Sequence, residues 1–191
     1  LDFLEAANIL ELDDGAWLVN LKSEGIKTPC LVKTAHGTTL YATRDLAAAR
    51  SRWSEFQFDR CLYVVGSEQI LHFNQLKATL KRAGESEWSD RIEHITFGLI
   101  RLTEGKLSTR SGLVLTLAEV LDRAAELARE IIAEKNPDLA NAEQVAEQVA
   151  VGAIVFHDLK HQRQKDVVFD WKEVLSFEGD TGPYLQYTHA R

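Results

Sequence analysis

The stretch that decides the fold is Cys61-Leu62-Tyr63-Val64-Val65-Gly66-Ser67-Glu68-Gln69-Ile70-Leu71-His72-Phe73. It opens with a continuous apolar run ending at Gly66, which is typical of a strand buried on both faces. Ser67 is placed to cap a helix that runs to about Ala83 and stops at Gly84. Another strand candidate spans residues 92–100. Strand, helix and strand in this order predict a crossover between two parallel strands.

The residues before this unit predict a β-rich opening over 1–42. The short apolar runs 17–21 and 30–33 are strand candidates, and Gly37 marks a hairpin turn before a third candidate at 38–41. Thr43 is a good N-cap for a helix that runs towards Trp53.

The pattern becomes helical after residues 111–116, where we expect the domain boundary. Thr116-Leu117-Ala118-Glu119 is a capping box, and apolar residues follow at helical spacing until Asn136-Pro137 ends the helix. A second helix is expected over 142–156, with a continuation from Leu159. The chain therefore predicts an α/β part followed by an all-helical region.

Composition narrows the class of protein. The 191 residues are 45% hydrophobic and 27% charged, as in a globular domain. The longest apolar run, 149–156, is too short for a membrane span. Because the first residues carry neither a basic region nor an extended apolar core, we expect no signal peptide. Two cysteines form neither a disulfide framework nor a complete zinc site, so we expect a reducing cytoplasm and no metal centre. The net charge of −7 argues against nonspecific coating of nucleic acid.

Because methionine is absent and both ends lie within patterned sequence, we interpret the chain as an excerpt of a longer protein.

Two polar stretches lie where predicted strands lead into helices, the usual position of a ligand crevice in parallel sheets. In the stretch 40–45, Asp45 has two readings: a ligand-binding carboxylate, or an acid that the helix dipole favours. In the stretch 65–73, Gln69 and His72 share one helical face. The alternative there is an ordinary helix start with a surface histidine.

Two further stretches carry groups that suit nucleotides or nucleic acid. The loop 105–112 combines two cations and three hydroxyls between glycines, which suits phosphate, although it lacks the P-loop spacing and also fits an ordinary surface loop. After the break at Pro183, Tyr184, Tyr187 and Arg191 fall at helical spacing. Such a stripe can stack on nucleic acid, but core packing is the better interpretation from the spacing alone.

Together these stretches closely resemble the arginyl-tRNA synthetases, a family of class I aminoacyl-tRNA synthetases. The resemblance rests on four runs: Tyr-x-Thr-Arg-Asp-Leu-Ala-Ala at 41–48, Val-Gly-x-Glu-Gln-x-x-His-Phe at 65–73, Gly-Lys-x-Ser-Thr-Arg-x-Gly at 105–112, and Gly-Asp-Thr-Gly-Pro-Tyr-Leu-Gln-Tyr-x-His-Ala-Arg at 179–191. It covers essentially the whole chain.

The resemblance implies that residues 1–115 are the C-terminal half of a Rossmann-type catalytic domain. Residues 116–191 would be the helical region that leads to an anticodon-binding domain. The parent protein would activate arginine with ATP and Mg²⁺ and transfer it to tRNA(Arg) in the cytoplasm. The family's first signature, His-x-Gly-His, is absent, so we expect the fragment alone to be inactive. The alternative is a non-catalytic module that binds RNA or a protein partner.

The resemblance also assigns roles to individual residues. Arginine would be bound by Tyr41, Asp45 and Gln69, with Tyr41 and Asp45 on the guanidinium. Lys106 and Ser108 would stabilise the ATP phosphates and act in catalysis, although Thr109 replaces the second lysine of that signature. His72 is a candidate for the same ATP crevice, and the backbone of 97–99 for adenine.

The expected tRNA contacts lie in the helical region. They are drawn from the cation-dense helical segment 157–165 and from the last predicted helix: Lys160, Arg163, Lys165, Tyr187 and Arg191. For the cationic segment, a solvated helix face interrupted by acidic residues is an equally good interpretation.

Overall fold

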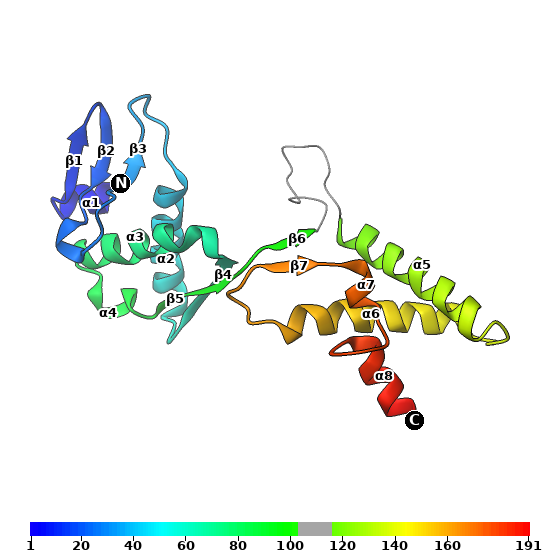
Figure 1. Cartoon of the computed structure of the whole chain (residues 1–191). Helices are drawn as coiled ribbons and strands as arrows, with labels where there is room; N and C mark the ends of the chain where they lie inside the picture. The colour runs from blue at the N-terminus through cyan, green and yellow to red at the C-terminus, as the bar shows by residue number, and fades with distance from the viewer. Residues whose placement is uncertain (103–115) are drawn as a thin grey trace. The chain divides into compact units, whose positions relative to one another are not determined.

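A computed structural model describes residues 1–102 and 116–191 of the chain (Figure 1). The chain divides into two compact units, Leu1–Phe97 and Gly98–Arg191, and each is described by itself. The boundary expected near residue 115 concerns the domains of the parent protein and stays a prediction.

The first unit opens with helix α1 (Asp2–Ala6) and an antiparallel sheet in the order β1 (Leu10–Asp13), β2 (Ala16–Val19) and β3 (Cys30–Lys33), with a 3-10 turn at Lys22–Glu24 between β2 and β3. The turn expected at Gly37 is present, and its φ is +82°. The strand expected at 38–41 is wrong, because only a single bridge joins Thr39 to Lys33. The following residues already form a helix.

Helix α2 (Tyr41–Phe56) begins two residues before the expected cap. Its N-cap is Leu40, which makes no side-chain cap, so the prediction that Thr43 caps the helix is wrong. The Thr43 hydroxyl donates instead to the carbonyl of Val32 in β3. That bond ties the first turn of α2 to the antiparallel sheet.

The predicted strand–helix–strand crossover is confirmed. Strand β4 (Cys61–Gly66) pairs in parallel with β5 (Ile92–Phe97), in a register that runs from Cys61 opposite Ile92 to Gly66 opposite Phe97. A 3-10 turn (Ser67–Gln69) and the helices α3 (Ile70–Arg82) and α4 (Ser86–Ser89) connect them. Ser67 makes no capping hydrogen bond, so its predicted role is wrong. Gly84, at φ +88°, follows the end of α3 as expected.

Strand β4 is buried on one face only. Tyr63 and Val65 pack against the core, which includes Phe73 and Leu76 of α3. Leu62 and Val64, on the opposite face, are 50% and 65% exposed. The prediction of burial on both faces is therefore wrong, because helices cover one face of this sheet in the described part of the unit.

The strand expected over 92–100 is divided between the two units. β5 ends at Phe97, and β6 (Ile100–Leu102) pairs in parallel with β7 (Val167–Phe169) instead. At the break, Gly98 lies so close to the backbone that an added Cβ would be 2.1 Å from the carbonyl oxygen of Lys165. Leu99 N–H donates to Asp166 Oδ1 at 2.8 Å. These contacts with residues 163–167 thus end β5 at Phe97, and the chain continues as β6, which pairs with β7.

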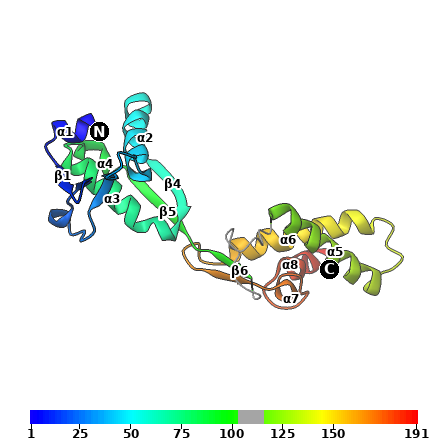
Figure 2. The ribbon, with the colours of Figure 1, turned by 90° about the horizontal axis from the view of Figure 1, so that it is seen from above.

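The second unit is otherwise helical, and its long helices α5 (Leu117–Lys135) and α6 (Ala142–Lys160) lie side by side (Figures 1 and 2). The capping box is confirmed: the Thr116 hydroxyl accepts from the Glu119 N–H, and the Glu119 carboxylate accepts from the Thr116 N–H. Small buried residues, including Ala124, Ala128 and Ala150, allow the close approach of the helices. None of the described helices has the length and apolar content of a membrane span.

Two shorter helices complete this unit. Asp170 caps α7 (Trp171–Val174), and Thr181 caps α8 (Gly182–Ala190), where proline stands in the first turn as expected. Helix α8 packs against α6 at its first residues, and the rest of it is exposed.

Candidate functional site

The candidate site begins at the carboxyl end of the parallel sheet in the first unit. β4 and β5 end opposite each other at Gly66 and Phe97, and the 3-10 turn follows β4 directly. Helices α2 and α3 pack against each other. His72 lies in the first turn of α3, whereas Asp45 is the fifth residue of α2, beyond its first turn, so the interpretation of Asp45 as an acid favoured by the helix dipole is wrong. The crevice beyond strand ends is where open parallel sheets bind ligands.

The structure brings Asp45 and His72 together although 27 positions separate them. Asp45 Oδ2 lies 2.7 Å from His72 Nε2, within hydrogen-bond distance. The carboxylate side chain is 36% exposed and the imidazole 19%. A carboxylate has about four lone-pair sites on two oxygens, so one bond from His72 leaves room for a bidentate donor.

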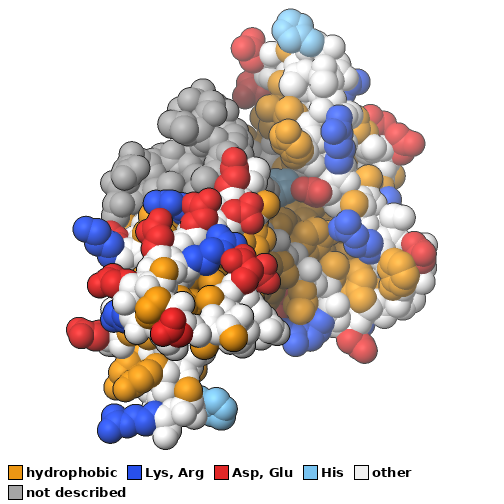
Figure 3. Space-filling view, turned by 90° about the vertical axis from the view of Figure 1, so that its right-hand side faces the viewer, with side chains coloured by type: hydrophobic (Ala, Val, Ile, Leu, Met, Phe, Trp, Pro, Cys, Tyr) orange, Lys and Arg blue, Asp and Glu red, His pale blue; other side chains and the backbone are white. Residues whose placement is uncertain are grey.

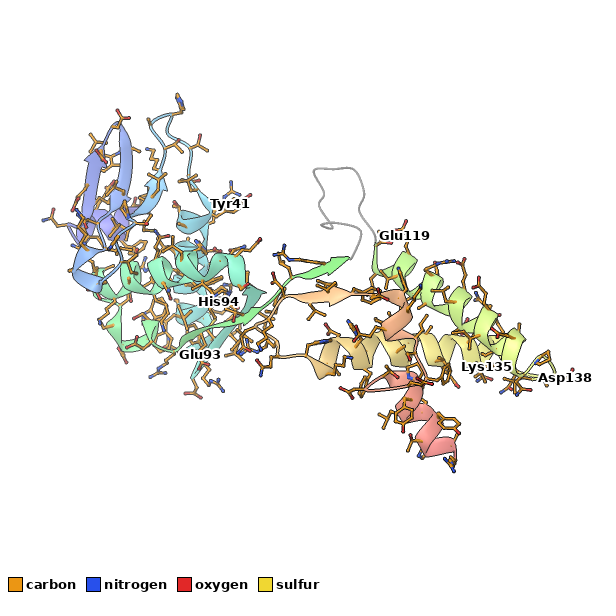
Figure 4. The ribbon with its side chains drawn as sticks, viewed as in Figure 1. Tyr41, Glu93, His94, Glu119, Lys135 and Asp138 are labelled. Carbon is orange, nitrogen blue, oxygen red and sulfur yellow. The ribbon has the colours of Figure 1, made fainter. Side chains whose placement is uncertain are left out.

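The His72 ring packs against a cluster of ring side chains formed by Phe73, Tyr63 and His94. It lies nearly perpendicular to the ring of Phe73, at a centroid distance of 5.1 Å, and Phe73 is 3% exposed. Tyr63 of β4 and His94 of β5 pack on Phe73 at 4.9 and 4.3 Å. His94 Nε2 lies 2.9 Å from the carbonyl oxygen of Val65 (Figure 4 labels His94). These contacts fix the position of the His72 ring relative to both strands of the sheet.

Sequence reasoning missed two residues beside the Asp45 pair. Arg52 Nη1 donates to the Tyr63 hydroxyl at 2.6 Å. Burial raises the pKa of Tyr63 and the charge of Asp45 adds to this, while Arg52 opposes both. The missed signal is helical spacing: Arg52 lies seven residues after Asp45, two turns along the same face of α2.

The two other residues expected to bind arginine border the same helix starts. Tyr41 is the first residue of α2 and is 80% exposed (Figure 4). It precedes Asp45 by four residues, so both lie on one face of the helix. Gln69 ends the 3-10 turn and is exposed. Their roles in binding stay predictions.

The expected ATP site is described only in part. Lys106 and Ser108, with the rest of the loop 105–112, lie outside the described residues. Phe97, at the end of β5, is 42% exposed. The amides of Gly98 and Leu99 are engaged within the second unit, where they donate to the Arg163 carbonyl and to Asp166 Oδ1, both at 2.8 Å. In the described parts of the chain, no group of three His, Cys, Asp or Glu residues is arranged to hold a metal ion.

The expected tRNA contacts are spread over different kinds of structure. The interpretation of 157–165 as one helical segment is wrong, because α6 ends at Lys160. Lys160 is also engaged: its Nζ lies 3.2 Å from Glu173 Oε1 and 2.9 Å from the Asp180 carbonyl oxygen. Arg163 and Lys165 are exposed and lie in the connection to β7.

The aromatic stripe of α8 does not belong to the core. Tyr184 and Tyr187 are 45% and 52% exposed, and Arg191 at the chain end is exposed. Figure 3 shows hydrophobic side chains reaching the surface among charged ones. The prediction of core packing is therefore wrong: α8 contacts α6 through Gly182 in its first turn and through Gln186, whose side chain donates to the Gln148 carbonyl.

Comparison with known proteins shows the family to which this chain belongs. A family model described as "tRNA synthetases class I (R), catalytic domain" matches residues 1–171. The chain is 52% identical over 188 residues to an arginine–tRNA ligase of Clostridium perfringens and 51% identical over 191 residues to one of Bacillus cereus. These matches cover 98% and 100% of this chain but 33% and 34% of the relatives, so the chain spans about a third of their length.

Solved structures agree with the sequence match. Arginyl-tRNA synthetase of Thermus thermophilus superposes with a TM-score of 0.76 at 27% identity, covering all of this chain and 38% of the other. The enzyme from Plasmodium falciparum superposes with a TM-score of 0.78 at 23% identity, covering 32% of that chain, which bears on the fold alone. From the family match over 1–171, the chain belongs to the class I (R) tRNA synthetases, and residues 1–171 match their catalytic domain.

Proposed function

We propose that this chain is part of an arginine–tRNA ligase, which activates arginine with ATP to arginyl-adenylate and transfers the arginyl group to tRNA(Arg). The observation that carries the proposal is identity of about half of all positions, over essentially the whole chain, to proteins named arginine–tRNA ligase. The geometry supports it, because the partly exposed carboxylate of Asp45 in α2 meets His72 in the first turn of α3, the helix that follows the parallel strand β4.

Asp45 is the proposed partner of the substrate guanidinium. A carboxylate accepts two parallel hydrogen bonds from a guanidinium, whereas the ammonium group of lysine cannot reproduce that fork. Tyr41 lies one helical turn away on the same face and would border the substrate. Gln69, after β4, would contact the same amino acid from the second helix start.

The proposed chemistry is an in-line displacement. The arginine carboxylate attacks the α-phosphate of ATP, a phosphorus–oxygen bond forms, and the bond to pyrophosphate breaks. Lys106, with Ser108, would stabilise the charge that develops on the leaving group. Mg²⁺ would accompany the nucleotide, since it keeps several waters and is commonly bound through substrate phosphates.

This chain spans about a third of the relatives' length, and in the proposal the parent protein supplies the remaining domains. In the proposal, residues 1–115 are half of a Rossmann-type catalytic domain and 116–191 connect it to an anticodon-binding domain. The surfaces of Arg163, Lys165, Tyr187 and Arg191 remain the candidates for tRNA contact. A cytoplasmic location suits Cys30 and Cys61, which are both free thiols.

Asp45→Asn in the full-length protein tests the substrate assignment. The change keeps the shape but removes the charge, so the bound guanidinium loses its partner, at a cost of about 3–5 kcal/mol in arginine binding. Citrulline, which is neutral at that end, should lose much less. Calorimetric titration with both ligands measures the difference.

The other outcomes are distinct. If Asp45 is only a surface residue of α2, the variant keeps its affinity for arginine and its selectivity over citrulline. Failure of the unaltered full-length protein to charge tRNA(Arg) with arginine would favour the non-catalytic binding module instead. The 191-residue chain alone should make no arginyl-adenylate, because positioning fails when part of the frame is absent.

A further inference from the structure

The geometry points to His72 as a positioning residue for Asp45, and so for recognition of the arginine side chain, rather than as a contact to ATP. This inference rests on the proposed function, in which Asp45 binds the guanidinium. It assigns His72 to the arginine side of the crevice because its polar ring atom Nε2 lies 2.7 Å from Asp45 Oδ2.

The hydrogen bond determines what each group can do. The Asp45 carboxylate is an acceptor, so His72 Nε2 carries the proton and donates to Oδ2. A donating Nε2 at this distance is directed at the carboxylate and not at a phosphate. Oδ1 and the second lone pair of Oδ2 remain to accept a guanidinium fork. His72 thereby restricts the rotation of Asp45 before the substrate arrives.

Such a restriction matters because Asp45 stands on a helix surface. Its side chain is 36% exposed, and an unrestrained carboxylate there would lose rotamer freedom on binding its ligand. Arg52, two turns further along the same face of α2, donates to the Tyr63 hydroxyl instead. In the described part of the chain, the ion-pair partner of Asp45 is His72.

The imidazole can hold Asp45 because it is itself held. Its ring packs nearly perpendicular to that of Phe73, which is buried and contacts Tyr63 of β4 and His94 of β5. A line of contacts therefore runs from the strands through Phe73 and His72 to Asp45. Groups that orient a binding residue are placed most accurately on such rigid elements.

The test uses two variants of His72 in the full-length protein, His72→Leu and His72→Gln. Leu removes the donor and keeps an apolar side chain against Phe73. Gln places an amide nitrogen as many bonds from Cα as Nε2 of the histidine, and so restores a donor. The readouts are kcat and the KM values for arginine and ATP in aminoacylation.

We expect His72→Leu to raise the KM for arginine about 2- to 10-fold, because the freed Asp45 side chain must then be ordered when the substrate binds. The KM for ATP should stay unchanged. His72→Gln should recover most of the loss. A raised KM for ATP with normal arginine kinetics, or a Gln variant as impaired as the Leu variant, would overturn the inference.

A double-variant cycle with Asp45→Asn separates positioning from general loosening of the site. If His72 acts through Asp45, His72→Leu adds little once Asp45 is changed. His94→Leu is the comparison variant, because it also removes a ring from Phe73 but keeps the His72 donor to Asp45; it should raise the KM for arginine less than His72→Leu does. Additive effects of His72→Leu and Asp45→Asn would refute the inference.

Failure of the inference is distinguishable from failure of the proposed function. If the unaltered protein charges tRNA(Arg) and Asp45→Asn impairs arginine binding while His72→Leu does not, only the positioning role is wrong. If Asp45→Asn has no effect on arginine, the assigned substrate site is wrong and the inference falls with it.

Discussion

Gly182→Ala should detach α8 from α6, because the two helices meet at a backbone-to-backbone contact. A Cβ at Gly182 would lie 2.6 Å from the carbonyl oxygen of Gly152 and 2.9 Å from Cα of Ala153, whereas ordinary contact begins at 3.4 Å. Both obstacles are backbone atoms of α6, so the clash cannot be relieved by turning a side chain. The two helices must separate.

The magnitude follows from two opposing effects. Alanine favours a helical position over glycine by up to about 1 kcal/mol. Overpacking a close contact costs about 1–3 kcal/mol, and it should win here because backbone must move. The loss should concentrate in α8, since the rest of that helix is exposed.

Gly152→Ala is the matched control on the facing helix. The atoms nearest to its Cβ would belong to the side chain of Gln186, with Nε2 2.6 Å away, and that side chain can turn aside. The gain in helix propensity, about 1 kcal/mol, offsets loss of the exposed hydrogen bond from Gln186 to the Gln148 carbonyl. We therefore expect little net change.

Hydrogen exchange of the peptide 182–190, measured by mass spectrometry beside urea denaturation of the chain, separates the two variants. Gly182→Ala should lower protection of α8 and the free energy of unfolding, and Gly152→Ala should not. Wild-type or better protection in Gly182→Ala would refute the close-contact reasoning.

Two further predictions concern a buried histidine and the phosphate loop. His157 is 5% exposed, and neither ring nitrogen has a hydrogen-bond partner among the described residues; burial, with His161 and Lys160, lowers its pKa from the ordinary 6.5. The unfolded chain therefore binds the proton more readily, so the free energy of unfolding is highest above pH 6.5 and falls as the pH decreases below it. Urea denaturation midpoints measured from pH 8 to 5 should decrease below pH 6.5. An equal decrease in His157→Leu would contradict this origin. Lys106→Ala in the full-length protein should lower the rate of adenylate formation about 100- to 1000-fold with little change in arginine binding, as measured before the steady state, and an unaltered chemical step would exclude the role.

Local patterns in the sequence were enough to predict most elements of this fold. The apolar run before Gly66 identified β4, and the order of elements implied its parallel pairing with β5. The capping box at Thr116 and the proline at the start of α8 marked helix starts correctly. These signals succeed because they depend on residues a few positions apart, whose backbone conformations and hydrogen bonds are coupled directly.

The errors have one physical cause: a local pattern does not specify what lies on the other side of an element. The run of β4 is equally apolar on both faces, yet Leu62 and Val64 are exposed. Thr43 has the chemistry of a cap, but the carbonyl of Val32 competes for its hydroxyl. The run 92–100 breaks because 163–167, distant in sequence, contact Gly98 and Leu99.

For the candidate site, too, the sequence predicted the local motifs, whereas tertiary packing determined which side chains meet. Its motifs, and through them the family, could be read from the sequence, because each motif is a short run with a fixed order of residues. The sequence alone assigned Asp45 and His72 to different ligands, since nothing local relates positions 27 apart. Only the packing of α2 against α3 over the parallel strands brings Nε2 to 2.7 Å from Oδ2. That distance depends on the whole unit, because Phe73, Tyr63 and His94 must be in place before the imidazole can face the carboxylate.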